Sequence, residues 1–386
     1  MALCLLLKDW AGMRDVSVIA LTVDHGLRLE SAGEAAKVGA LLQARGIDHI
    51  ILRWDGDKPQ THIQEKARAA RYALMADYCA AQGIGCLFVA HHAQDQAETF
   101  WMRLAHGSGL AGLGGMTAKS EIYGVHLIRP LLSFDRQDLR DYCRAKGVMW
   151  IEDSSNVNDK YLRPRLRAFE DVLAEEGLTP QRLSDVMRKL HHAEEVLQFY
   201  TQQTLQQAAV FHDEGYVSLV REKLQGLPLD IGRRVLETVL QRQTPGDYGP
   251  GYAQVLSIAH NMMAADFSGV TIHGCEIFFH DDKIIICREE AAVSARIPVQ
   301  DNMIWDGRFQ ISGFKGLEVG ALRDHGLALL ADKISNDRAL EKKIRTLPFK
   351  VRKTLPVFWD GAEIVAVPHL GLGRDVGRIS PVSAFA

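Results

Sequence analysis

The chain has 386 residues, of which 47% are hydrophobic and 24% charged, so it has the composition of a globular protein with two or three domains. A formal net charge of -3 excludes a uniformly basic surface, so any RNA contact has to come from local clusters of lysine and arginine. Six cysteines without a CxxC pair argue against a disulfide or zinc scaffold, and no run of about 18 apolar residues occurs; we expect a cytoplasmic protein that contacts no membrane.

The first part of the chain alternates short β-rich runs with helical patterns. We expect an apolar helix from Met1, strands over residues 16–23, 49–54 and 86–90, and helices over 31–45, 64–81 and from Ala93. Short strands between longer helices predict a parallel sheet covered on both faces. Residues 1–182 are therefore predicted to form a doubly wound α/β domain.

Two further domains are predicted after this one. Residues 183–290 are expected to form a helical middle domain, with helices from Leu183 and over 230–242, and a β-hairpin of runs 270–279 and 283–287 that turns at Asp281 and Asp282. A glycine- and proline-rich loop over 244–251 interrupts it. Residues 297–386 are expected to form a small α+β domain that ends in a strand over 363–367.

Asp24, His25 and Arg28 follow the first predicted strand directly. The carboxyl ends of strands in open α/β sheets are where ligands bind, so these side chains are candidates for a ligand pocket. An equally plain alternative is a polar turn in which Asp24 caps the next helix.

A second polar cluster follows the strand over 86–90, beginning with His91 and His92. On a helix from Ala93, Asp95 and Glu98 share a face, and carboxylate oxygens near phosphates are what Mg²⁺ requires. One alternative is a zinc or di-metal hydrolase, although no HExxH motif or spaced third ligand occurs. Another is that Asp95 only caps the helix.

Residues 107–116 are rich in glycine, and their opening spells GxGxxG. A helix precedes these glycines where a dinucleotide fingerprint needs a strand, so that interpretation fails. We expect the flexible backbone of this segment to let a substrate or a neighbouring loop approach closely, or else to form a plain helix end and turn.

Basic residues gather in two further places. Arg129 and Arg136 precede a polar loop over 150–156 and the run that contains Arg163, Arg165 and Arg167, which suits phosphate recognition or, alternatively, a solvated helix start. A second cluster beside Phe349 and Trp359 suits RNA backbone contact and base stacking, or is an ordinary wet surface. Its members are Arg338, Lys342, Lys343, Arg345, Lys350, Arg352 and Lys353.

Five segments together resemble the tRNA(Ile)-lysidine synthase family in order and spacing. They are Val-Asp-His-Gly-Leu-Arg from Val23, His-His-Ala-Gln-Asp-Gln-Ala-Glu-Thr from His91, the glycine-rich segment from Gly107, Arg-Pro-Leu-Leu from Arg129, and Glu-Asp-Ser-Ser-Asn with Arg-Pro-Arg-Leu-Arg from Glu152 and Arg163. Residues 348–372 also resemble the C-terminal domain of that family.

The resemblance implies a PP-loop ATPase fold and a ligase that uses ATP and Mg²⁺. ATP would adenylate the C2 oxygen of the wobble cytidine of tRNA(Ile) with a CAU anticodon, and the amine of free lysine would then displace AMP to give lysidine. A PP-loop tRNA thiolase and a non-catalytic tRNA-binding remnant are the alternatives, and a homodimer is left open.

The resemblance also implies roles for the candidate residues. Val23, Asp24, His25, Arg28, Gly107 and Gly109 would bind the nucleotide. His91, Asp95 and Glu98 would be catalytic through contacts to phosphate, lysine or Mg²⁺, with Asp95 and Glu98 as the metal ligands. Arg163, Arg165, Arg167, Lys342, Lys343, Arg345, Lys350 and Arg352 would contact phosphates or RNA.

This sequence departs from the family pattern in three places. His106 stands where arginine is usual before Gly-Ser-Gly, and Pro164 stands where asparagine is usual. A Ser-Gly-Gly-x-Asp-Ser pyrophosphate loop and its strand should directly precede the Met1-Ala2-Leu3 helix. We therefore expect the natural chain to start upstream of Met1, and the sheet of this chain to lack its first strand, which leaves two unpaired edges inside the domain.

Overall fold

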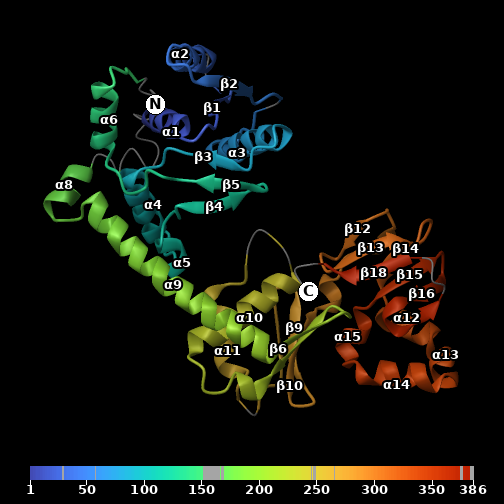
Figure 1. Ribbon diagram of the computed structural model, residues 1–386. Coiled ribbons are helices and arrows are strands. Elements are labelled where there is room, and N and C mark those ends of the chain that lie inside the picture. The colour runs from blue at the N-terminus through green and yellow to red at the C-terminus, as the bar shows by residue number, and fades with distance from the viewer. Residues whose placement is uncertain are drawn as a thin grey trace. The chain divides into compact units, whose positions relative to one another are not determined.

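A computed structural model describes residues 1–27, 30–56, 58–150, 166, 169–244, 246, 249–264, 266–373 and 377–382. The chain forms two compact units, Met1–Glu195 and Val196–Ala386. Helix α9 (Pro180–Ala208) runs through their boundary, and the predicted boundary at residue 182 also falls within it (Figure 1). The three-domain division stays a prediction. In these ranges no helix is long and apolar enough to cross a membrane.

The strands of the first unit form two sheets. Strand β1 (Ile19–Asp24) pairs in parallel with β2 (Asp48–Arg53). Strand β3 (Cys86–Phe88) pairs in parallel with β5 (Val125–Ile128), to which β4 (Lys119–Ile122) adds antiparallel. The α/β class is confirmed, but the predicted single sheet is divided, because no hydrogen bonds of the described backbone join β1 to β3.

Helices cover both faces of β1, as a doubly wound domain requires. Leu21 packs in one core with helix α3 (Ile63–Ala81), and Ala20 packs on the opposite face with α1 (Ala2–Gly12), α2 (Ser31–Gln43) and α6 (Arg136–Ala145). This alternation follows from the two-residue period of a strand. Helix α3 also packs on β3 and β5, so it holds the two sheets together.

The remaining helices of this unit are α4 (Ala93–Ala105), α5 (Leu110–Leu113) and α8 (Glu170–Glu175). Helices α2, α3 and α4 begin within one residue of their predicted starts. Strand β1 begins three residues later than predicted.

The second unit opens with a five-stranded antiparallel sheet covered by α10 (Leu229–Gln243) and α11 (Tyr252–Asn261). The predicted hairpin is present, with Asp281 and Asp282 both in the left-handed region typical of a tight hairpin turn. The run over 270–279 is two strands, separated at His273 and Gly274. The sheet order is β6 (Ala209–His212), β7 (Tyr216–Val220), β10 (Lys283–Arg288), β9 (Cys275–His280) and β8 (Val270–Ile272). Strands β6 and β7 were not predicted.

The end of the chain is the small α+β region that the sequence predicts. One sheet has the order β11 (Ile297–Pro298), β14 (Glu318–Ala321), β15 (Pro356–Asp360), β16 (Glu363–Val367) and β17 (Leu372–Gly373). A second has the order β12 (Met303–Trp305), β13 (Phe309–Gly313) and β18 (Gly377–Pro381), so two strands follow β16, the predicted last strand. The helices are α12 (Arg323–Leu329), α13 (Ala331–Asn336), α14 (Arg338–Thr346) and α15 (Phe349–Lys353).

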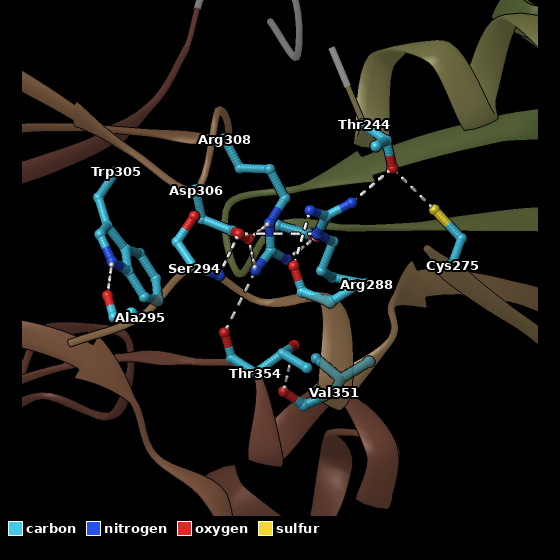
Figure 2. A network of polar contacts seen from close by, with 12 residues as sticks. Thr244, Cys275, Arg288, Ser294, Ala295, Trp305, Asp306, Arg308, Val351 and Thr354 are labelled. Carbon is cyan, nitrogen blue, oxygen red and sulfur yellow. Dashed lines mark hydrogen bonds and ion pairs between the residues drawn. The ribbon is translucent and has the colours of Figure 1, made fainter. Parts of the chain in front are cut away.

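A buried polar network ties this α+β region to the five-stranded sheet within the second unit (Figure 2). Arg308 is fully buried; it binds Asp306 Oδ2 through Nε and Nη2, at 2.8 and 2.7 Å, and the Gly215 carbonyl oxygen through Nη1. Asp306 Oδ1 accepts from the Ser294 N–H and lies 3.6 Å from Nε of Arg288. Because Gly215 lies between β6 and β7, the network links strands far apart in sequence.

Candidate nucleotide and substrate site

Asp24, the last residue of β1, organises the loop that follows it. Its Oδ1 accepts hydrogen bonds from the Ser31 hydroxyl at 2.6 Å and from the Gly26 N–H at 3.0 Å. The hydrogen bond from Ser31 lowers the pKa of Asp24 most, and the one from Gly26 lowers it further, so the carboxylate is ionised at neutral pH. One carboxylate oxygen therefore ties the loop to the start of α2. Asp24 is not the cap of α2, because the N-cap residue is Glu30 and Asp24 accepts from the Ser31 hydroxyl and from no described backbone N–H of the helix.

His25 and Val23 lie on either side of Asp24 in the chain. Val23 is half-buried in the core under α3. The His25 ring meets Trp54 edge to face at 6.2 Å, and its Nδ1 is buried without a hydrogen-bond partner in the described part. Burial and the charge of Arg71 lower the pKa of His25, which leaves the imidazole neutral. Arg28 lies outside the described residues.

Asp95 closes a capping box at the start of α4. Its Oδ2 accepts from the His92 N–H at 3.0 Å, and the His92 side chain accepts from the Asp95 N–H. Both the capping alternative and a ligand role remain compatible with this geometry, because Oδ1 of Asp95 makes no hydrogen bond to any residue that the structure describes.

His91 and Glu98 flank Asp95 at the same end of α4. Burial is the main cause that lowers the pKa of His91 to about 4; the charge of Asp95 opposes this, and the charges of Arg68 and Arg129 add to it. Glu98 is 5% exposed, and its Oε1 lies 3.9 Å from Nη2 of Arg136. It lines a shallow hollow together with Gln94, Ala97, Trp101, Leu166, Leu173, Leu178 and Pro180.

One helix relates the two polar clusters. The charge of Arg71 on α3 lowers the pKa of both His25 and His91, so the field of one guanidinium reaches both imidazoles. His25 follows the end of β1, and His91 follows shortly after the end of β3. That the two strand ends face a common ligand stays a prediction, as do the individual roles.

The glycine-rich segment differs from the prediction in detail. Gly107 ends α4 in the left-handed region, with its N–H bonded to the Leu104 carbonyl at 3.0 Å, as in an ordinary helix C-terminus. A Cβ at Gly107 or Gly109 would meet nothing within 4 Å, whereas one at Gly115 would overlap the Met187 side chain. Neighbouring side chains therefore approach closely at Gly115, which lies within the predicted segment and has a φ of 76° that favours glycine.

Two glutamines of the His91 segment position neighbouring loops, a role that was not predicted for them. Gln96 makes two hydrogen bonds to the backbone of Met116, at 2.7 and 2.8 Å. Gln94 binds Asp135 Oδ2 at 2.8 Å and accepts from the Arg136 N–H at 2.9 Å. Their signal was available, because polar residues on the inner side of an amphipathic helix need buried partners.

The predicted phosphate and RNA contacts divide into groups. Lys342 and Lys343 are exposed and make no ion pair within the described ranges, whereas Arg345 pairs with Glu341 at 2.7 Å. Lys350 pairs with Glu276, and Arg352 donates to the Leu347 carbonyl at 2.8 Å. Arg163, Arg165 and Arg167 lie outside the described residues.

The described residues contain no group of three or more His, Cys, Asp or Glu side chains that could hold a metal ion. The zinc hydrolase alternative therefore has no ligand set in this part of the chain. Asp95 and Glu98, three residues apart on α4, supply two carboxylates, which is the usual protein share of a Mg²⁺ site that also uses substrate phosphates.

Comparison with known proteins gives the family. Residues 1–173 match the PP-loop domain family. A tRNA(Ile)-lysidine synthase of Ruegeria pomeroyi is 35% identical over 365 residues, which cover 93% of this chain and 83% of that protein. The protein of the same name from Wolbachia pipientis wMel is 33% identical over 322 residues, covering 81% and 75%, and that of Methylobacterium nodulans is 44% identical over 182 residues, covering 47% and 54%.

Among solved structures, a U34-tRNA thiolase from Methanococcus maripaludis with its [4Fe-4S] cluster aligns with 50% of this chain and 67% of its own chain, at 15% identity and a TM-score of 0.43. That likeness is too low to bear on function. The sequence relationships carry the assignment: the chain belongs to the tRNA(Ile)-lysidine synthase family, and its first unit contains the PP-loop domain.

Proposed function

We propose that the chain attaches lysine to C2 of the wobble cytidine of tRNA(Ile) with a CAU anticodon, at the expense of ATP. In the first step the C2 oxygen attacks the α-phosphorus of ATP, and pyrophosphate leaves. In the second step the lysine amine attacks C2, the bond from C2 to oxygen breaks, AMP leaves and the amine loses a proton. Family membership over nearly the whole chain is the observation that carries this proposal.

The polar clusters after β1 and β3 suit this chemistry. The lowered pKa of His91 keeps the imidazole neutral at pH 7, so it can hydrogen-bond lysine or a phosphate without adding charge, but it makes His91 a weak proton acceptor. His25 is neutral for the same reason, and so it can hydrogen-bond a nucleotide without adding charge. The ionised Asp24 holds the loop that presents His25.

Mg²⁺ fits the residues at the start of α4. Asp95 Oδ1 and the Glu98 carboxylate are hard oxygen donors at the end of α4 where the helix dipole also favours phosphate. When bound, Mg²⁺ would neutralise charge on the triphosphate. We assign Asp95 and Glu98 to it, with free lysine as the second substrate of the same site.

RNA contact is assigned to the basic cluster of the α+β region and to Arg163, Arg165 and Arg167. Within the cluster, Lys342 and Lys343 are the favoured phosphate contacts, because their charges are exposed and not neutralised by a described carboxylate. Phe349 is 56% exposed and can stack on a base.

The test is a reaction of the purified chain with ATP, Mg²⁺, lysine and a tRNA(Ile) transcript, followed by mass spectrometry of its nucleosides. We expect lysidine, with one AMP and one pyrophosphate for each lysidine formed. A transcript with uridine at the wobble position is the matched control and should give none. Binding of tRNA without pyrophosphate release would instead favour the non-catalytic tRNA-binding alternative.

A further inference from the structure

Arg129 differs from the other buried arginines of the described chain. Arg233 is 5% exposed and pairs with carboxylates three and four residues away on α10, and Arg308 is fully buried and pairs with Asp306. Arg129 is 8% exposed and makes no ion pair with any carboxylate that the structure describes. A buried charge costs free energy unless a charge of opposite sign compensates it. Arg129 has no such partner among the described residues, so an anion bound from outside the chain would supply the missing charge.

The guanidinium of Arg129 is held in place along one side. Its Nη1 donates to the Thr117 carbonyl at 2.9 Å and to the Ser120 hydroxyl at 3.0 Å. Its Nε is buried and has no hydrogen-bond partner among the described residues. The edge formed by Nε and Nη2 is the one that binds two oxygens of an oxyanion, and here it is oriented in advance and unused.

Arg129 lines an open hollow between α3 and the β4–β5 hairpin. Arg68 lies on the same wall; burial first, and then the charge of Arg68, lower the pKa of Arg129, so two guanidinium groups act on this space. The acidic residues in the lining are Glu65, which lies 3.6 Å from His62, and Glu121, which is exposed. Tyr72, Ser120 and Tyr123 add neutral polar groups to the wall, and Ala69, Ile122 and Leu127 are its apolar part.

The hollow is close to the candidate site. Arg129 directly follows β5, and His91 follows β3, its parallel neighbour, in which Phe88 is opposite Ile128. The charge of Arg129 also lowers the pKa of His91, so the two side chains lie within electrostatic reach of each other. A group bound by Arg129 would therefore sit beside the proposed reaction centre.

We propose that Arg129, with Arg68, forms a subsite for a phosphate group of the substrates. The phosphate belongs either to the triphosphate of ATP or to a phosphodiester of the tRNA. The choice between these sources rests on the proposed function, whereas the presence of an anion site does not.

The first test uses inorganic phosphate and pyrophosphate as probes of thermal unfolding. Either anion should raise the melting temperature of the unaltered chain, and Arg129→Met should weaken its apparent affinity at least tenfold. Without anion, Arg129→Met should melt no lower than the unaltered chain, because it removes an uncompensated charge. The matched control is Arg188→Ala, an exposed arginine that pairs with Asp185 at 2.6 Å, and it should behave like the unaltered chain.

Equal anion affinity in Arg129→Met and the unaltered chain overturns the proposal. If Arg129→Met fails to fold, Arg129→Lys provides the same test, because it keeps the charge and loses the two-pronged edge. We expect Arg129→Lys to fold and to bind either anion at least tenfold more weakly.

The second test identifies the source by equilibrium binding of ATP and of tRNA(Ile) to Arg129→Met. A tenfold or larger loss for one ligand, with the other unchanged, names the source, and no loss for either overturns the subsite. These measurements need no turnover. A chain that makes no lysidine but binds phosphate through Arg129 would refute the proposed function and leave the subsite standing.

Discussion

At the scale of single residues, Asp95 has two roles, a helix cap and a proposed metal ligand. Its Oδ2 accepts from the His92 N–H and so completes the start of α4, while the proposed chemistry uses the charge of the same carboxylate. An amide oxygen can accept the capping hydrogen bond equally well but cannot supply the charge. The two roles can therefore be separated by substitution.

We predict that Asp95→Asn unfolds with a free energy within about 0.5 kcal/mol of the unaltered chain, whereas Asp95→Ala loses about 1 kcal/mol through the broken cap. Both should reduce lysidine formation at least a hundredfold. Urea unfolding and the lysidine assay measure the two effects. Asp337→Asn is the control, because Asp337 caps α14 through the N–H groups of Ala339 and Leu340, far along the chain from the site. Full activity in Asp95→Asn would reduce Asp95 to a cap.

At the scale of elements, the basic cluster on α14 and α15 is not uniform. Leu340 and Ile344 bury one side of α14, which leaves Lys342 and Lys343 exposed. Lys350 on α15 already faces Glu276, and its charge is partly neutralised. Exposed charge without a carboxylate partner attracts phosphate most strongly, so the two lysines of α14 should dominate RNA binding by this region.

Replacement of both Lys342 and Lys343 by alanine should weaken tRNA binding about tenfold. It should also reduce the slope of the logarithm of the affinity against the logarithm of the salt concentration by about 1 to 2. Filter binding at several salt concentrations checks both expectations. Lys315→Ala, which removes an exposed lysine 3.8 Å from Asp301, should change neither. An unchanged salt dependence in the double variant would remove α14 from the RNA contact.

Prediction from sequence succeeded where the pattern was local. Helices α3 and α10 have long apolar periodicity, and the Asp281 turn has a local chemical signature, so all three were located. Strands β6 and β7 were missed, because β6 starts directly after α9 without a break and β7 gains its central place only by pairing with the distant β10.

The candidate site shows the same division. Asp24, His25, His91 and Asp95 follow predicted strands, so the sequence indicated them. Arg129 is a different case: the basic motif drew attention to it, but its importance lies in the absence of a described carboxylate partner, which only tertiary structure reveals.

At the scale of the whole molecule, a buried charge network stabilises the second unit. Asp306 is placed between Arg308, which is fully buried, and Arg288 (Figure 2). Asp306→Asn leaves both guanidinium groups without a carboxylate, so we predict a loss of about 3 to 5 kcal/mol in the free energy of unfolding. Urea unfolding followed by circular dichroism measures it. Asp301→Asn, an exposed substitution in the same region, should lose less than about 0.5 kcal/mol. Equal midpoints for the two variants would show that the network is not stabilising.

Buried histidine adds a dependence of stability on pH. Burial lowers the pKa of His369 below its ordinary value of 6.5, and its ring packs 5.4 Å from that of Phe309. Above pH 6.5 the imidazole is neutral in both the folded and the unfolded chain, so His369 causes no loss in the free energy of unfolding there. As the pH falls below that value, the unfolded chain binds a proton that the folded chain does not, and stability is lost. His369→Phe should therefore lose less of its free energy of unfolding between pH 7 and pH 5 than the unaltered chain, as measured by urea unfolding at both values. Equal losses would mean that His369 is protonated in the folded state as readily as in the unfolded chain, and burial at this position would then have no effect on its charge.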